Sequence, residues 1–129
     1  MTDSAAGTRR ALILFAHGSR DAEWVRPFEA LRQTVSASHT GVSIALAYLE
    51  STNPDLSTCI RALADENVND IRVLPLFLAL GKHLRSDIPA LASKVADEFP
   101  GLRIEFLPAL GETPELADAL LKIAMRAVS

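Results

Sequence analysis

Four short apolar runs alternate with amphipathic segments along this chain of 129 residues, and that alternation restricts its fold more than any other feature. Each run is bounded by polar or turn-forming residues, as expected for a strand that is buried on both faces of a sheet. The predicted strands are Arg10–Ala16, Val42–Leu49, Ile71 to about Leu78, and Leu102–Leu107.

Apolar residues at helical spacing follow each predicted strand. We expect the first helix over residues 22–38, because its apolar positions repeat every three or four residues. The Asn53-Pro54 pair predicts the start of the second helix, with Asn as the N-cap and Pro in the first helical position. The apolar face of the first helix consists of Trp24, Phe28, Leu31 and Val35, and that of the second of Leu56, Ile60 and Leu63.

The third helix is predicted to begin near Ser86-Asp87 and to end at Pro100-Gly101, where proline and glycine stop a helix. The segment before it, which contains Gly81-Lys82-His83, is expected to be a loop. Thr113-Pro114 predicts the start of the last helix. Its inner face is expected to consist of Leu116, Leu120 and Ile123.

The order of elements is therefore strand then helix, four times over, which is typical of a parallel sheet covered on both faces. We predict an α/β fold with a four-stranded parallel sheet in the order 2-1-3-4, like half of a flavodoxin-type domain. Residues 9–129 form this single domain, and residues 1–8 are expected to be a disordered tail. Pro75 cannot donate to the sheet, so the third strand contains a bulge or ends early.

Composition excludes several classes of function. The net charge of −3 gives no overall attraction to nucleic acid or to an anionic membrane. No apolar run approaches the length of a membrane span, and the N-terminus lacks the apolar core of a signal peptide. The single cysteine, Cys59, excludes an internal disulfide. We therefore expect a cytoplasmic protein that binds neither nucleic acid nor membrane.

Two histidines and a glutamate stand at or just beyond the ends of the first three predicted strands, at equal intervals along the chain. They are His17, Glu50 and His83. The carboxyl ends of parallel strands lie at one edge of a sheet, where ligand-binding groups gather. Two imidazoles and a carboxylate are a metal-ligand set, so these residues are candidate metal ligands. The ordinary alternatives are a solvated acid for Glu50 and, for the loop after His17, a simple helix cap.

The remaining histidine, His39, lies at the predicted end of the first helix and is interpreted as a capping residue. A histidine phosphatase would also place His-Gly after a strand, with the imidazole as nucleophile. Such enzymes have arginine directly before that histidine, whereas this chain has Ala16. A phosphoryl-transfer enzyme is therefore a minor alternative.

Three blocks of this sequence resemble the sirohydrochlorin chelatases, the class II tetrapyrrole chelatases. The blocks are LFAHGSRD, then AYLE with a proline four residues after the glutamate, then VLPLFLALGKHLRSDIP. The resemblance covers roughly Leu12 to Pro89, and the length matches the short form of the family, in which one small domain assembles as a homodimer. It implies insertion of a divalent ion, cobalt or iron, into a tetrapyrrole without ATP, in cobalamin or siroheme synthesis.

The resemblance also implies roles for individual residues. His17 and His83 match the paired catalytic histidines that bind the metal, and Glu50 matches an acidic residue of the family. Sirohydrochlorin is a polycarboxylate, so the nearby cations are expected to bind its carboxylates. The substrate-binding candidates are the cations Arg20, Lys82 and Arg85, together with Ser19. No cofactor is expected beyond the divalent metal substrate, which can be cobalt, iron or nickel. A non-catalytic carrier of metal or tetrapyrrole is the second hypothesis.

Overall fold

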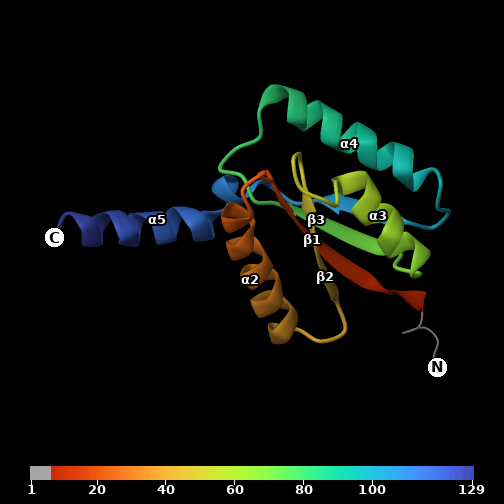
Figure 1. Ribbon diagram of the computed structural model, residues 1–129, viewed down its shortest axis with the longest axis horizontal. Coiled ribbons are helices and arrows are strands. Elements are labelled where there is room, and N and C mark those ends of the chain that lie inside the picture. The colour runs from red at the N-terminus through yellow and green to blue at the C-terminus, as the bar shows by residue number, and fades with distance from the viewer. Residues whose placement is uncertain (1–6) are drawn as a thin grey trace.

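The computed structural model describes residues 7–129, and a parallel sheet runs through its centre (Figure 1). The sheet has four strands in the order β2-β1-β3-β4, and each neighbouring pair is parallel. This confirms the predicted topology. Each strand begins within one residue of the expected position: β1 is Arg10–Ala16, β2 is Ser43–Tyr48, β3 is Asp70–Pro75 and β4 is Arg103–Phe106.

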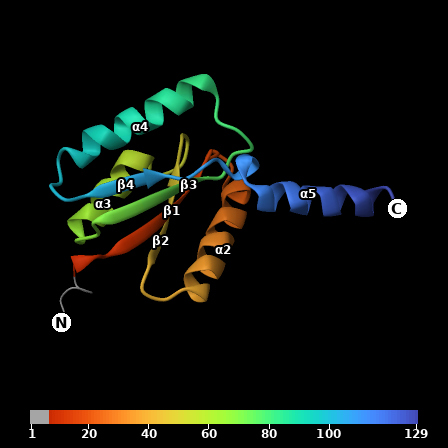
Figure 2. The same ribbon diagram turned by 180° about the vertical axis from the view of Figure 1, so that it is seen from behind.

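Helices cover both faces of the sheet, as predicted. In the two opposite views of Figures 1 and 2, α2 lies on one face, and α3 and α4 lie on the other. The last helix, α5, projects away from the body. The helical elements are α2 (Ala22–Ser38), α3 (Leu56–Asp65), α4 (Lys82–Ala96), the short 3-10 helix η1 (Leu110–Glu112) and α5 (Pro114–Ala127).

The main core lies between the sheet and the α3/α4 layer. Alternate residues of β1, including Ile13 and Phe15, point into it and are fully buried. Val73 of β3 and Ile60 of α3 meet them there. The opposite residues of β1, such as Leu14, pack in a smaller cluster beneath α2. Burial of the central strand on both faces explains its nearly continuous apolar sequence.

The third strand ends earlier than the predicted Leu78. Its last residue is Pro75, which pairs with Phe15, and the amide of Leu76 still donates to the carbonyl of Phe15 at 2.8 Å. Beyond this point the chain leaves the sheet, and Leu78 is 70% exposed. Of the two alternatives at Pro75, the structure therefore shows the early end.

The start of α3 differs from the prediction. Asp55 is the N-cap, and its side chain accepts from the amide of Thr58 at 2.8 Å. The Asn53–Pro54 bond is cis, and the Pro54 carbonyl accepts a hydrogen bond from the Tyr48 amide. This pair therefore belongs to the loop that closes onto the end of β2. An aspartate two residues further on takes the capping role that the sequence assigned to Asn53.

Helix α4 begins at Lys82 rather than near Ser86, with Gly81 as its N-cap. The amide of Arg85 donates to the Gly81 carbonyl at 3.0 Å, which forms the first helical turn. His83 thus lies in the first turn of a helix, and its predicted position in a loop was wrong. Pro89 occupies the interior of this helix instead of its first turn.

Helix α5 begins as predicted, with Thr113 capping the amide of Leu116 and Pro114 in the first position. Its expected inner face, however, does not face the core. Leu120 is 50% exposed and Ile123 is 52% exposed, because the helix extends away from the sheet (Figures 1 and 2).

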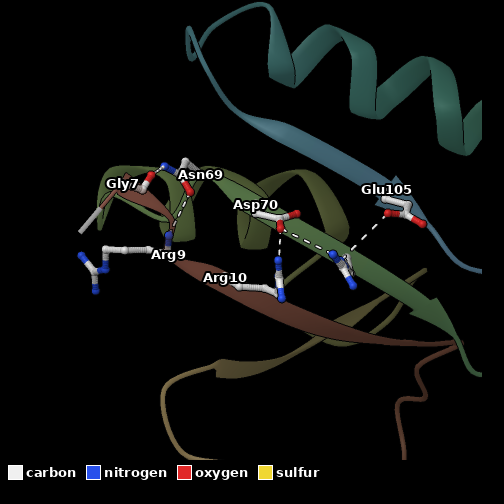
Figure 3. Close-up of polar contacts among 7 residues, drawn as sticks. Gly7, Arg9, Arg10, Asn69, Asp70 and Glu105 are labelled. Carbon is white, nitrogen blue, oxygen red and sulfur yellow. Dashed lines mark hydrogen bonds and ion pairs between the residues drawn. The ribbon is translucent and has the colours of Figure 1, made fainter. Parts of the chain in front are cut away.

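Figure 3 shows how polar contacts hold the amino-terminal edge of the sheet. The Asn69 side chain accepts from the amide of Arg9 and donates to the carbonyl of Gly7. Arg10 and Asp70 pair across β1 and β3 at 2.8 Å. The predicted tail over residues 1–8 lies almost wholly outside the described residues. None of the helices described within residues 7–129 has both the length and the apolar character of a bilayer-spanning segment.

Candidate functional site

The carboxyl edge of the sheet carries the three candidate metal ligands. His17 directly follows β1, Glu50 lies two residues beyond β2, and His83 lies in the helix that follows β3. Because β1 is paired with both β2 and β3, the connections that carry these residues leave neighbouring strands at the same edge. The topology therefore brings the segments that carry these residues to one edge of the sheet.

His17 and Glu50 form a contact pair across the ends of β1 and β2. The imidazole Nε2 lies 3.7 Å from the carboxylate Oε1, and both side chains are well exposed to solvent. The other ring nitrogen, Nδ1, lies 3.3 Å from the Gly18 carbonyl. With the proton on Nδ1, this carbonyl is its acceptor and Nε2 presents a lone pair beside a negative charge. Such a pair can bind a cation or accept a proton.

The imidazole of His17 packs against an aromatic ring, which itself packs against a second ring in the core. The His17 ring meets the Phe77 ring edge-on, with centroids 6.3 Å apart, and Phe77 meets Phe15 in the same way at 5.6 Å. Edge-to-face contacts of this kind restrict ring orientation. Phe77 was not a predicted site residue, because the sequence placed it within a buried strand. The early end of β3 at Pro75 is what turns it toward His17.

Gly18 allows the two strand-end loops to touch. Its φ is +93°, and a Cβ at this position would lie 2.0 Å from the carbonyl oxygen of Glu50. The Glu50 amide in turn donates to the His17 carbonyl at 3.1 Å. Only glycine fits this left-handed conformation and this close approach. The backbone of His17-Gly18 thus determines the position of the Glu50 backbone.

A second connection between the loops involves Ser19 and Thr52. The Ser19 amide donates to the Thr52 hydroxyl at 3.0 Å, and that hydroxyl donates to the Ser19 carbonyl at 2.8 Å. The Ser19 hydroxyl accepts from the amide of Asp21, which caps α2 through its carboxylate. Thr52 was missed by the sequence analysis, because its role depends on a contact between two loops.

His83 is exposed in the first turn of α4. Across residues 7–129, no three side chains of histidine, cysteine, aspartate or glutamate are grouped closely enough to hold a metal ion. The structure therefore joins His17 with Glu50 but does not add His83 to them as a third ligand. That His17 and His83 share one ion stays a prediction.

The candidate cations differ in their surroundings. Arg20 and Lys82 are exposed. Arg85 is engaged within the protein: its guanidinium contacts the Glu112 carboxylate at 3.0 Å and the Leu80 carbonyl at 3.1 Å. Glu112 was not foreseen from the sequence. Arg85 therefore links the start of α4 to η1, while its remaining N–H groups are available to a ligand.

A hollow of about 450 Å³ adjoins His17 on the α2 side. This volume lies in the range of small-molecule sites. Burial, followed by the charge of Glu29, raises the pKa of Tyr48 in its wall, so this hydroxyl stays neutral. The wall is formed by His17, Gly18, Ser19, Trp24, Val25, Phe28 and Tyr48.

Curated proteins similar to this chain include two that are named sirohydrochlorin chelatases. A sirohydrochlorin cobaltochelatase of Saccharolobus islandicus is 30% identical over 117 residues, which cover 86% of this chain and 90% of that protein. A sirohydrochlorin ferrochelatase of Bacillus subtilis is 27% identical over 113 residues, or 87% of this chain. The chain spans 43% of the length of that Bacillus relative.

The solved structures that match have the same fold. The putative cobalamin biosynthesis CbiX protein of Marinobacter aquaeolei gives a TM-score of 0.78 at 34% identity, and covers 92% of this chain and 97% of that one. Bacillus subtilis SirB with Fe³⁺ gives 0.75 at 25% identity, over 89% of this chain and 46% of that one. The family model CbiX matches residues 11–127. The chain therefore belongs to the CbiX family.

Proposed function

We propose that this protein is a sirohydrochlorin chelatase that inserts a divalent metal, cobalt or iron, into the macrocycle without ATP. The observation that carries the proposal is the His17–Glu50 pair, 3.7 Å apart at the sheet edge beside the 450 Å³ hollow, in a chain of the CbiX family. The relatives named for cobalt and iron chelation support the same activity.

Metal insertion requires bases as well as ligands. The macrocycle must release two protons, and the incoming ion must exchange its water for protein and then pyrrole nitrogens. A neutral imidazole can bind the ion through nitrogen and then accept a proton. Nitrogen ligands suit Co²⁺, Fe²⁺ and Ni²⁺ better than Mg²⁺. In the proposal His17 and His83 share these roles, and Glu50 supplies negative charge that attracts the cation.

The macrocycle is proposed to lie over the sheet edge with part of one face against the hollow. Trp24 and Phe28 offer apolar surface there. The carboxylates of the macrocycle would meet Arg20, Lys82, Arg85 and the hydroxyl of Ser19.

His83 must come close to His17 for the two to hold one ion. Imidazole nitrogens bind first-row metals at about 2.0–2.1 Å, so two such nitrogens on one ion are at most about 4 Å apart. His83 occupies the first turn of α4, and helix ends fray more readily than helix interiors, so we propose that this turn adjusts when the metal binds. The proposal is that metal binding selects this arrangement.

The proposed working form is a homodimer in the cytoplasm. A single sheet edge is a shallow ledge, whereas a tetrapyrrole is a broad plate whose burial needs a facing wall. A second copy can supply that wall. Cobalamin or siroheme synthesis is the proposed setting, and no cofactor beyond the metal substrate is proposed.

Visible absorbance tests this function directly. Sirohydrochlorin is mixed with Co²⁺, Fe²⁺ or Ni²⁺ separately, with and without enzyme, and conversion is followed over many equivalents. We expect turnover with at least one metal, and a loss of most of the rate in His17→Ala and His83→Ala. His39→Ala is the matched control, since His39 is an exposed histidine at the far end of α2.

The same assay decides between an enzyme and a carrier. A carrier binds one equivalent of ion or macrocycle and stops, whereas a chelatase continues. Near-normal turnover by the double variant His17→Ala, His83→Ala would place the chemistry at other residues.

A further inference from the structure

The His17–Glu50 pair is formed by two loops that each follow a strand. His17 begins the loop of residues 17–21 between β1 and α2, and Glu50 lies in the loop of residues 49–55 between β2 and α3. The carboxylate of Glu50 is well exposed, and within residues 7–129 its contact with His17 is the one polar contact that it makes. No other side chain holds the carboxylate in place, so the geometry of the pair depends on how the two loops are joined.

The backbone joins the two loops only as far as Glu50. The amide of Leu49 donates to the Ala16 carbonyl at 2.9 Å, and the amide of Glu50 donates to the His17 carbonyl at 3.1 Å. These two bonds continue the pairing of β1 with β2 beyond the strand ends. In the described part of the chain, no further backbone hydrogen bond connects the two loops after them. Any connection beyond Glu50 must therefore come from side chains.

The hydroxyl of Thr52 makes that connection. It accepts from the Ser19 amide at 3.0 Å and donates to the Ser19 carbonyl at 2.8 Å, so that one side chain engages both backbone groups of one residue. A hydroxyl has one proton to donate and lone pairs to accept with, and both bonds form at once. Thr52 is partly buried. A valine of the same shape could form neither bond.

The conformation of Ser51 lets its two neighbours act on the same loop. Its φ is +64°, in the left-handed region that residues with a Cβ rarely adopt. Such a conformation persists where the surrounding contacts determine it. Here Glu50 reaches His17 on one side of Ser51 and Thr52 reaches Ser19 on the other. Glu50 thus lies between two points at which its loop is attached to the loop of His17.

We propose that Thr52 is a positioning residue for metal binding, whose hydroxyl keeps His17 and Glu50 close enough to contact one ion. Metal bonds to imidazole nitrogen and carboxylate oxygen are about 2.0–2.2 Å long, so two such donors on one ion are at most about 4 Å apart. The observed 3.7 Å between Nε2 and Oε1 is just inside this limit. Even a small separation of the loops would carry the pair beyond it. The inference rests on the proposed function, in which these two residues meet the incoming metal.

Calorimetric titration with Co²⁺, on protein without macrocycle, tests the role of Thr52. Thr52→Val should weaken Co²⁺ binding about tenfold or more, as is typical when a group that supports a metal ligand is removed. Thr52→Ser keeps the hydroxyl and should restore affinity close to that of the wild type. The matched control is Thr40→Val, because Thr40 is an exposed threonine before the opposite end of β2.

Steady-state metallation provides a second readout. Thr52→Val should raise the KM for Co²⁺ more than the KM for sirohydrochlorin, because Arg20, Lys82 and Arg85 remain available to the carboxylates of the macrocycle. A general loosening of the fold would not separate the two constants in this way. Circular dichroism confirms that each variant is folded. Thr52→Ala removes the same hydroxyl and replaces Thr52→Val if the valine variant does not fold.

Three results would overturn the inference. They are wild-type Co²⁺ affinity in Thr52→Val, equal losses of affinity in Thr52→Val and Thr52→Ser, and a wild-type affinity that His17→Ala leaves unchanged. The last would mean that the pair does not bind the ion. If the wild type binds Co²⁺ through His17 but metallates no macrocycle, the proposed function fails, and the titration alone still decides the role of Thr52.

Discussion

Replacing Gly18 by alanine should separate the two loops that hold His17 and Glu50. The added Cβ would lie 2.0 Å from the Glu50 carbonyl oxygen, whereas real contacts of this kind are essentially never below 3.0 Å. The Glu50 backbone must therefore retreat by about 1 Å, the difference between those two distances. A misplacement of about 1 Å at a catalytic group can lower a rate about 100-fold.

The stability change has two parts. Alanine in the left-handed region costs about 1–2 kcal/mol. Forcing an extra carbon into a filled space adds about 1–3 kcal/mol. We thus expect Gly18→Ala to lower the free energy of unfolding by about 2–5 kcal/mol, as measured by urea denaturation with an unchanged m-value.

The chain provides a matched control in Gly41. Its φ is +87°, nearly that of Gly18, but apart from Gly41 and its chain neighbours no atom of residues 7–129 lies within 4 Å of the position that a Cβ would take. Gly41→Ala should therefore show only the conformational cost of about 1–2 kcal/mol, with a normal insertion rate. If Gly18→Ala were no less stable than Gly41→Ala and inserted metal at the wild-type rate, the contact between the loops would not position the site.

Three further outcomes follow from particular side chains. Arg85→Ala should weaken macrocycle binding in an absorbance titration with little effect on metal binding. It should change the free energy of unfolding by less than about 1 kcal/mol, since the ion pair between Arg85 and Glu112 is largely exposed. The control Glu112→Gln breaks the same pair but should keep macrocycle affinity, so equal losses of affinity in the two variants would contradict this role of Arg85. The Thr58 amide lowers the pKa of Asp55, so the Asp55 carboxylate stabilises α3 at neutral pH and this contribution is lost as pH falls through that lowered pKa. Asp55→Ala should thus lower the free energy of unfolding by about 1 kcal/mol at pH 7, and a difference from the wild type that persists undiminished in strong acid would refute the assignment. Burial raises the pKa of Cys59 to about 11, so a maleimide at pH 8 should label this thiol only after the protein is unfolded, and rapid labelling of the native protein would show that the site opens.

Much of the fold was predictable because its signals are local. The four apolar runs fixed the strands to within a few residues, and right-handed crossovers left few orders for a parallel sheet. Thr113-Pro114 marked the start of α5 correctly, because a hydroxyl cap and a first-turn proline act on the nearest backbone groups. The same signals placed His17, Glu50 and His83 after the ends of neighbouring strands, whereas the sharing of one ion by His17 and His83 stays a prediction.

What the sequence could not determine depends on contacts between distant segments. The approach of Gly18 to Glu50, the Ser19–Thr52 hydrogen bonds and the position of Phe77 under His17 all join residues far apart along the chain. The N-cap of α3 is Asp55 rather than the predicted Asn53. The Pro54 carbonyl accepts from the Tyr48 amide at the end of β2, so the Asn53-Pro54 pair belongs to the preceding loop.

Helix α5 shows the same difference between what a local sequence pattern predicts and what tertiary contacts determine. Sequence alone determined that α5 is a helix with a broad apolar side, because periodicity is a property of the segment itself. Which surface the apolar side of α5 covers depends on contacts with other parts of the protein, and the sequence of the helix does not specify it. Only the tertiary structure decided that α5 leaves its own sheet, because the contacts of Gly111 and Glu112 set the direction in which the helix starts.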